Sequence, residues 1–379
     1  MGLIDTIEFI PYRLPLTRPW CSACGQLSER RGWLVQVRCG GLRGFGDCAP
    51  LPAAGTEEAG VARDWLNAWR VRTLRRPLAS ALDDLAEADT EIGGAWGSDP
   101  APAARYAAEC ALADLAAQGA GVSLAHWLSA SDTGHPWPKA ATGSAANALD
   151  RVPVNAALGA LGDITPAVLR EWGSAGYRVL KVKVGLGPSA EDLRRLAALA
   201  QHIPEGVALR LDANRAWNLG QASRVVAGLA GQAGLRVESL EEPLRDPRAT
   251  DLRRLQAEAG FPLALDESLH SPGATWDLGD LPVRRVVLKP AAIGGLRRTL
   301  ALAVRARDAG LEVVLTSLID SAAGLWPTVH LAAAVGGKVP HGLATGHWLA
   351  TDLGEPPRPR AGFIQVPSAP GGGFRPGPP

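Results

Sequence analysis

The sequence predicts an α/β protein in which a parallel (β/α) barrel follows an N-terminal α+β segment. Near the N-terminus of the 379-residue chain, apolar residues alternate as they do in antiparallel strands. From Val152 onwards, short apolar segments alternate with amphipathic ones, as expected of β/α units. A doubly wound open sheet is the alternative architecture. No G-x-G-x-x-G motif follows a first strand, which disfavours a dinucleotide-binding version of that sheet.

Antiparallel strands are expected between Ile4 and Pro52. Ile4–Leu16 is strand-like, and Trp33, Val35 and Val37 alternate on one face of a second strand. The polar segment Leu16–Arg31 between them is predicted to be a loop.

A second predicted loop, Ala49–Gly55, precedes two predicted helices. The first helix is expected to begin at Thr56, whose hydroxyl can cap it, and to extend to about Trp69. The second is expected from Pro102, which suits a first helical turn, to about Gln118.

Seven apolar segments after residue 150 are the expected barrel strands, and a weaker eighth follows them. They are Val152–Leu158, Arg178–Val184, Val207–Asp212, Leu235–Glu241, Pro262–Asp266, Arg285–Lys289, Leu311–Ser317 and, more weakly, Gly342–Thr345. The helices expected between them include Ala190–Gln201, Ala222–Gln232, Thr250–Ala259 and Leu296–Ala309. Gly354–Pro379 is rich in glycine and proline and is predicted to be irregular or partly disordered.

Overall charge and hydropathy exclude several classes of function. The formal charge is +1, and no basic patch is interleaved with aromatic residues, so neither nucleic acid nor an acidic membrane is an expected partner. Charge or glycine interrupts each apolar stretch before the ~20 residues that a membrane span needs. The N-terminus lacks the layout of a signal peptide, and we therefore expect a cytoplasmic protein.

Two lysines lie two residues apart in one predicted strand. Lys181 and Lys183 therefore point to the same face of the strand, where neighbouring ammonium groups favour the neutral form that a general base requires. A solvated lysine pair on an edge strand is the alternative. The 39 basic residues comprise five lysines and 34 arginines, so lysine is used here in a chain that otherwise prefers arginine. Arginine cannot release its proton in a protein, whereas lysine can.

Three consecutive predicted strands end in a carboxylate: Asp212, Glu241 and Asp266. Because the carboxyl ends of parallel barrel strands lie on one rim, we expect these side chains to be neighbours. Clustered carboxylates repel one another unless a cation lies between them, and all-oxygen ligands favour Mg²⁺ or Mn²⁺. Caps of the following helices are the alternative role.

The sixth and seventh predicted strands add further polar residues to this rim. Lys289 ends strand six, opposite strand two, so Lys183 and Lys289 are expected to face each other across the metal. Ser317, Asp320 and Ser321 follow strand seven, either as hydrogen-bonding partners of a substrate or as an ordinary polar loop.

Five segments carry a family resemblance: Lys181–Gly185, Arg210–Trp217, Leu240–Pro243, Asp266–Leu269 and Leu288–Pro290. They resemble segments of the enolase superfamily and, within it, of the ortho-succinylbenzoate synthase family of enteric bacteria. The resemblance implies a modified TIM-type (β/α)7β barrel over residues 126–353, a capping domain over 1–125 with two substrate-covering loops, and a separate tail over 354–379.

The resemblance also implies a reaction, the Mg²⁺-dependent dehydration of a succinyl-hydroxycyclohexadiene carboxylate to 2-succinylbenzoate in menaquinone biosynthesis. Lys183 would be the acid/base, and Asp212, Glu241 and Asp266 would bind the metal that stabilises an enediolate. Lys289 would stabilise the ring by a cation–π contact. Among the supporting residues, Lys181 would favour the neutral form of its neighbour, while Arg210 and Asn214 would orient the site.

Other activities remain open at this level. An N-acylamino acid racemase, a dipeptide epimerase or a cycloisomerase would use the same metal ligands, and a racemase would need both Lys183 and Lys289. A barrel that binds metal and carboxylate without catalysis would explain the acids and leave the lysines unexplained. The sequence predicts a small-molecule carboxylate as partner and does not predict the oligomeric state.

Overall fold

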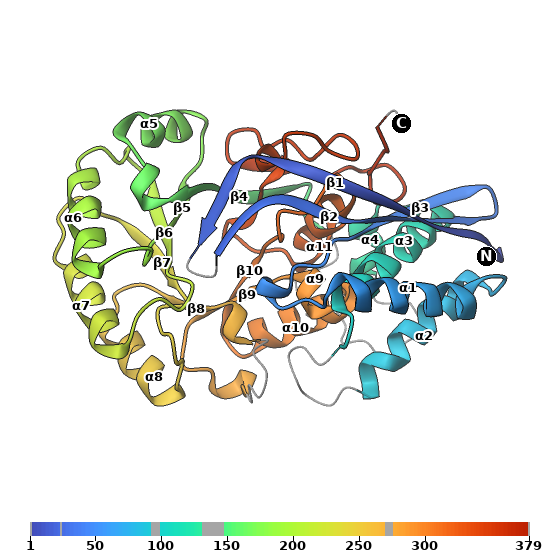
Figure 1. Ribbon diagram of the computed structural model, residues 1–379, viewed down its shortest axis with the longest axis horizontal. Helices are drawn as coiled ribbons and strands as arrows, with labels where there is room; N and C mark the ends of the chain where they lie inside the picture. Colours follow the sequence, from blue (N-terminus) through green and yellow to red (C-terminus); the bar gives the residue numbers. More distant parts are fainter. Residues whose placement is uncertain (1, 23–24, 92–98, 131–147, 270–275, 378–379) are drawn as a thin grey trace.

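A computed structural model describes residues 2–22, 25–91, 99–130, 148–269 and 276–377. An antiparallel sheet with helices forms the N-terminal part, and a parallel barrel surrounded by helices forms most of the remainder (Figure 1). The predicted α/β class and the parallel barrel are therefore confirmed, and the open doubly wound sheet is excluded.

The N-terminal sheet has the order β1-β2-β3, with both pairs antiparallel. Its strands are β1 (Ile4–Ser22), β2 (Gly25–Cys39) and β3 (Leu42–Cys48). Helices α1 (Ala59–Thr73), α2 (Leu78–Glu91), α3 (Pro102–Ala120) and α4 (Leu124–Ser129) follow it. The alanine-rich helix α3 is buried along most of its length because the sheet covers one side of it and the barrel helices the other.

Strand β3 lies unusually close to α3 at two glycines. A Cβ added at Gly44 or at Gly46 would lie 2.0 Å from the carbonyl oxygen of Ala111 or Ala107, respectively. Since no side chain fits there, glycine is what allows the sheet to pack against the helix backbone.

The prediction that Leu16–Arg31 forms a loop is wrong. Strands β1 and β2 continue through it as one long hairpin that extends from the N-terminal sheet to the barrel (Figure 1). The segment is polar because much of this hairpin is exposed to solvent, and the resulting pattern is easily taken for a loop.

Eight parallel strands form the barrel. They are β4 (Arg151–Ala160), β5 (Val179–Lys183), β6 (Ala208–Asp212), β7 (Val237–Glu241), β8 (Leu263–Leu265), β9 (Arg285–Leu288), β10 (Glu312–Leu315) and β11 (His341–Ala344). The helices between them are α5 (Pro166–Ser174), α6 (Ser189–Ala200), α7 (Leu219–Ala230), α8 (Ala249–Glu258), α9 (Pro290–Ile293), α10 (Leu296–Asp308) and α11 (Ala322–Val335).

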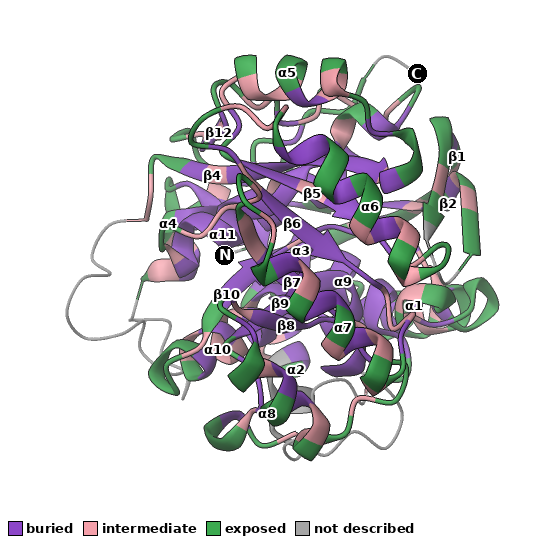
Figure 2. Cartoon of the chain, turned by 90° about the vertical axis from the view of Figure 1, so that its left-hand side faces the viewer, coloured by how far each residue is buried: buried purple, intermediate pink, exposed green. Residues whose placement is uncertain are grey.

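The barrel strands are largely buried, while the helices around them alternate buried and exposed faces (Figure 2). Strands β10 and β11 form no continuous ladder but are linked by the bridge between Thr316 and Gly342 and by the Leu315 N–H, which donates to His341 Nδ1, so the barrel is nearly closed. In the register of neighbouring strands, Lys183 pairs with Asp212 and Asp212 with Glu241. These strand ends therefore lie side by side on one rim.

Two local predictions differ from the structure. Thr56 does not cap α1; its hydroxyl accepts a hydrogen bond from the Leu51 backbone N–H and thereby closes the preceding loop. The C-terminal segment is irregular as expected, but up to residue 377 it packs against the rest of the chain. It contributes a short strand, β12 (Phe363–Gln365), which pairs with the start of β4.

No helix in the part of the chain that the structure describes is long and apolar enough to cross a membrane.

Replacing Gly46 with alanine tests the close packing of β3 on α3. We expect the free energy of unfolding to fall by about 1–3 kcal/mol, because the new Cβ overlaps the Ala107 carbonyl. Chemical denaturation measures the change. The matched control is Gly60→Ala in α1, where no atom lies within 4 Å of the new Cβ and helix propensity improves. Equal stability of the two variants would contradict the packing argument.

Candidate active site

A cavity of about 190 Å³ opens at the carboxyl ends of the barrel strands. Both predicted covering segments reach it, because Trp20, Gln26 and Leu27 of the hairpin line one wall and Leu51 and Ala54 another. Most of the ionisable residues singled out in the sequence also line it: Lys181, Lys183, Asp212, Asp266 and Lys289, together with Asn214. The cavity thus combines an apolar roof with a charged floor.

Lys183 is the last residue of β5 and is almost fully buried. Its Nζ donates to Asp212 Oδ2 at 2.7 Å and to Asn214 Oδ1 at 2.6 Å. The Trp20 ring lies over this ammonium group, with 5.6 Å between Nζ and the ring centroid. The hairpin therefore shields from solvent the amine that the sequence predicts to be the acid/base.

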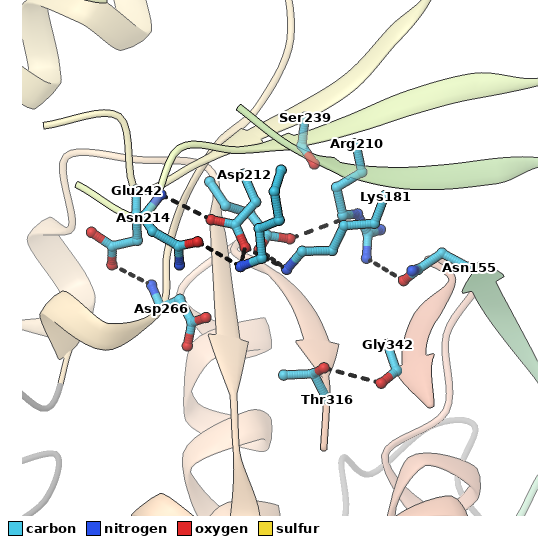
Figure 3. Close-up of polar contacts among 12 residues, drawn as sticks. Asn155, Lys181, Arg210, Asp212, Asn214, Ser239, Glu242, Asp266, Thr316 and Gly342 are labelled. Atoms are coloured by element: carbon cyan, nitrogen blue, oxygen red, sulfur yellow. Dashed lines mark hydrogen bonds and ion pairs between the residues drawn. The ribbon is translucent and has the colours of Figure 1, made fainter. Parts of the chain in front are cut away.

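Lys181 lies between two of the predicted metal ligands. Its Nζ is 2.9 Å from Asp212 Oδ2 and also forms an ion pair with Glu241 (Figure 3). Burial by itself lowers the pKa of Lys181, but the charges of Asp212 and Glu241 outweigh it, so the pKa is raised. From the sequence alone, the two lysines are expected to be neighbouring like charges. In the structure both ammonium groups contact Asp212, so an anion lies between them.

Burial alone would raise the pKa of Asp212. The ammonium groups of Lys181 and Lys183 outweigh burial, so the pKa of Asp212 is lowered and its carboxylate is ionised.

The strand on the far side of the barrel shows the same pairing of charges. Lys289, which follows β9, places its Nζ 2.7 Å from Asp266 Oδ2. Burial raises the pKa of Asp266 to about 7 despite this contact.

Two of the three acids have a buried oxygen without a hydrogen-bond partner. Glu241 Oε1 and Asp266 Oδ1 are buried and accept no hydrogen bond in the structure. Buried carboxylate oxygens are costly without a partner, and the lysine amines neutralise only part of the charge. In the described part of the chain, no three His, Cys, Asp or Glu side chains already surround one point as metal ligands would. The amines of Lys181 and Lys289 lie among these acids instead.

Arg210 supports the site from inside the barrel and does not line the cavity. Its guanidinium donates to Glu238 on β7 and, at 3.0 Å, to Asn155 Oδ1 on β4 (Figure 3). Its Nε lies 3.9 Å from Glu241 Oε1. Arg285 of β9 also contacts Glu238, so this network joins four barrel strands beneath the charged floor.

Asn214 lies between Lys183 and Glu267, to which its Nδ2 donates at 3.0 Å. Glu242 accepts from the backbone N–H groups of Asp266 and Ser268 at 2.6 and 2.9 Å and so holds the turn after β8. Asn214 and Glu242 both have positive φ, at 43° and 44°. Such backbone angles are uncommon outside glycine and often mark functional sites.

The polar segment after β10 divides into two parts. Ser317 lines the cavity, whereas Asp320 and Ser321 do not. Ser321 instead donates through its backbone N–H and its hydroxyl to Asp47 Oδ2, at 2.9 and 2.8 Å. Ile319 has a positive φ of 59° just before these two residues, and Ser321 joins the N-terminal part to the barrel through Asp47.

Several cavity residues were not identified from the sequence: Trp20, Leu27, Asn155, Thr316 and Thr345. Trp20 packs edge-on against Trp348, with ring centroids 4.5 Å apart, which fixes the hairpin on the barrel. The signal that could have identified Trp20 is a large aromatic residue within a polar segment. Asn155 gave no comparable signal, because its importance depends on its contact with Arg210.

Comparison with known proteins agrees with this geometry. The family model described as "Enolase C-terminal domain-like" matches residues 165–378. The o-succinylbenzoate synthase of Salmonella heidelberg (strain SL476) is 30% identical over 326 residues, which cover 85% of each chain. The o-succinylbenzoate synthase of Salmonella typhi shows the same identity and coverage.

Solved structures share the fold across nearly the whole chain. The L-Ala-D/L-Glu epimerase from Bacillus subtilis has a TM-score of 0.81 at 21% identity and covers 98% of both chains. The N-succinyl Arg/Lys racemase from Bacillus cereus has a TM-score of 0.82 at 20% identity, covering 100% of this chain and 96% of its own. Fold and cavity are those of a barrel enzyme with its site at the carboxyl ends of the strands. More particularly, the chain belongs to the enolase superfamily.

The buried carboxyl group of Asp320 is expected to make the stability of the protein depend on pH. Burial and the neighbouring charge of Asp47 raise the pKa of Asp320 to about 7. The folded protein therefore binds a proton that the unfolded chain releases above about pH 4, and this contribution to stability is lost as the pH rises through 7. The Asp320→Asn variant has no carboxyl group at this position, so it does not lose this contribution to stability as the pH rises. Between pH 5 and 8 we expect the variant to lose less stability than wild type, by an amount on the order of a few kcal/mol.

Thermal unfolding at both pH values in magnesium-free buffer measures this difference. Asp64→Asn removes an exposed carboxylate, 75% of whose side chain is accessible, and serves as the control. If wild type, Asp64→Asn and Asp320→Asn lose the same stability, Asp320 does not titrate as inferred.

Proposed function

We propose that this protein is a Mg²⁺-dependent dehydratase that converts 2-succinyl-6-hydroxy-2,4-cyclohexadiene-1-carboxylate into 2-succinylbenzoate in menaquinone biosynthesis, in the cytoplasm. The observation that carries the proposal is that Lys183 and Lys289, on opposite barrel strands, line one cavity with acids between them. The curated relatives bearing the name o-succinylbenzoate synthase support this choice of reaction.

The metal site in this proposal consists of Asp212, Glu241 and Asp266, with Mg²⁺ as the ion and Mn²⁺ as a substitute. A bound cation would act as a Lewis acid toward the substrate carboxylate and so favour removal of the neighbouring proton. On binding, the cation would displace the amine of Lys181 from Asp212 and Glu241, which it now contacts. The two buried oxygens without hydrogen bonds would gain a partner.

Lys183 carries out both proton transfers. Its neutral amine removes the proton from the ring carbon that bears the carboxylate, and the ammonium so formed donates a proton to the hydroxyl on the adjacent carbon. The C–H and C–O bonds break, one water molecule leaves, and the ring becomes aromatic. Asn214 orients this amine by accepting a hydrogen bond from it at 2.6 Å.

The remaining walls suit the rest of such a substrate. Lys289 approaches from the opposite side as an ammonium ion, because the charge of Asp266 outweighs burial and raises the pKa of Lys289. A cation over a ring face stabilises negative charge that develops there. Trp20, Leu27 and Leu51 provide an apolar surface for the ring and the methylene groups of the succinyl chain.

Racemisation of an N-acylamino acid is the second candidate, favoured by the same pair of facing amines. One amine would remove the α-proton and the other would return a proton on the opposite face. The fold shared with the N-succinyl Arg/Lys racemase is compatible with this activity, although at 20% identity it is evidence for the fold alone.

Replacing Lys183 with alanine tests the acid/base assignment. We expect turnover of the diene carboxylate to fall about 10²–10⁴-fold, because the proposed general base is removed. Lys338→Ala removes an exposed lysine outside the cavity and should retain wild-type turnover. Near-normal dehydration by a folded Lys183→Ala protein would contradict the assignment. Wild type that binds the diene carboxylate without turning it over would favour the non-catalytic alternative.

Lys289→Arg separates the two candidate reactions. Arginine retains the positive charge but cannot exchange a proton, so a dehydratase should keep most of its turnover while a racemase should lose it. Dehydration of the diene carboxylate and exchange of the α-hydrogen of an N-succinylamino acid in D₂O are measured for wild type and variant. The proposal would be replaced by racemisation if wild type exchanged the α-hydrogen rapidly, did not dehydrate the diene carboxylate, and lost the exchange on substitution of Lys289 by arginine.

A further inference from the structure

We propose that a second site, a groove lined by arginines on the side of the barrel opposite the active site, binds an extended acidic peptide segment of a partner protein. We call it the arginine groove. Its walls are formed by residues 41–45 around the start of β3, the end of α3, Arg151, Trp326 and residues 355–376 of the C-terminal segment.

The arginine groove is separate from the catalytic cavity. No residue lines both. Arg151 is the first residue of β4, at the amino end of the barrel strands, whereas Lys183 and Asp212 end β5 and β6 at the opposite rim. A ligand in the groove would therefore not compete with a substrate, and the proposal is independent of the reaction proposed above.

Positive charge dominates the arginine groove. Two carboxylates line it, Asp114 and Glu355, and both are already engaged. Asp114 is buried and accepts hydrogen bonds from the backbone N–H groups of Phe45 and Gly372, while Glu355 lies 3.4 Å from Arg358. Five exposed arginines line the same groove: Arg43, Arg151, Arg358, Arg360 and Arg375. Five positive and two negative side chains give the groove a net charge of +3, against +1 for the whole chain.

Two of these arginines lie over aromatic rings within cation–π range. Arg151 Cζ lies 4.4 Å from the centre of the Phe363 ring, and Arg43 Cζ lies 6.0 Å from that of Phe45. Phe374 packs against Phe45 with 5.3 Å between ring centroids. A guanidinium held over a ring has fewer accessible conformations and keeps its N–H edge available, so it is prepared for in-plane contacts with carboxylates. Neither Arg43 nor Arg151 forms an ion pair among the described residues.

The walls of the groove are held in place by main-chain pairing. β12 pairs with β4 from Arg151 to Pro153, the Gly371 N–H donates to the Val122 carbonyl, and the Gly377 N–H donates to the Leu353 carbonyl. The groove therefore exists before a ligand binds, which lowers the entropic cost of association.

Size and donor chemistry favour a peptide over a phosphate compound. The groove encloses about 1250 Å³, more than most small-ligand pockets and far more than the cavity of about 190 Å³ at the active site. Its cationic groups come from separate segments and are matched best by a ligand whose charge is also distributed. Phosphate sites commonly use backbone N–H groups at helix N-termini, but no described helix begins in this lining, and Pro356, Pro367 and Pro370 offer no N–H.

The test uses a fluorescently labelled hexaglutamate peptide and the full-length protein. Saturable binding is expected, weakening as salt concentration rises. In the double variant Arg43→Gln/Arg151→Gln we expect the dissociation constant to rise about tenfold, because two guanidinium contacts are lost. Arg72→Gln/Arg224→Gln removes the same charge from exposed positions outside the groove and should leave binding unchanged.

Absence of saturable binding, or equal weakening in both double variants, would overturn the proposal. Tripolyphosphate provides the other arm of the experiment. If it binds more tightly than the peptide and depends on Arg43 and Arg151, the groove is a phosphate site and not a peptide site. Thermal unfolding of both double variants verifies that they are folded.

Discussion

The structure depends on how buried negative charge is neutralised at one rim of the barrel. Asp212, Glu241 and Asp266 are each at most 2% exposed, and ionised carboxylates at such depth are unstable without positive partners. The structure supplies these partners as the amines of Lys181, Lys183 and Lys289. The same electrostatic requirement underlies the proposal that a divalent cation binds at this rim, with two amines facing the cavity.

The fold makes this arrangement a consequence of strand register. Lys183, Asp212 and Glu241 are paired on adjacent parallel strands, so the position of one fixes the position of the others. The N-terminal part then covers the cavity, because Asp47 holds the segment after β10 and Trp20 of the hairpin packs against Trp348. The ionisable residues of the cavity lie on the barrel, and the N-terminal part contributes mainly apolar residues such as Trp20, Leu27 and Leu51.

The barrel and its charged rim could be predicted from the sequence because both follow from short-range patterns. A short apolar segment that ends in an acid or a lysine indicates both a barrel strand and the end of that strand that lies on the rim. The hairpin was missed because its exposed strands carry polar residues. The hydrogen bonds of Ser321 to Asp47, outside the cavity, could not be predicted because the two residues are 274 positions apart in the chain. The networks around Arg210 and Glu242 were also beyond prediction, since they join strands that are distant along the chain.

A crystal structure of the protein soaked with Mn²⁺, with the ion located by anomalous diffraction, tests the central claim most directly. The account predicts one strong peak within direct coordination distance of Asp212, Glu241 and Asp266, and predicts that Lys181 Nζ withdraws from Glu241. A fully soaked crystal that shows no peak at this rim, with the amine of Lys181 still paired to both acids, would contradict the claim that these carboxylates form a metal site.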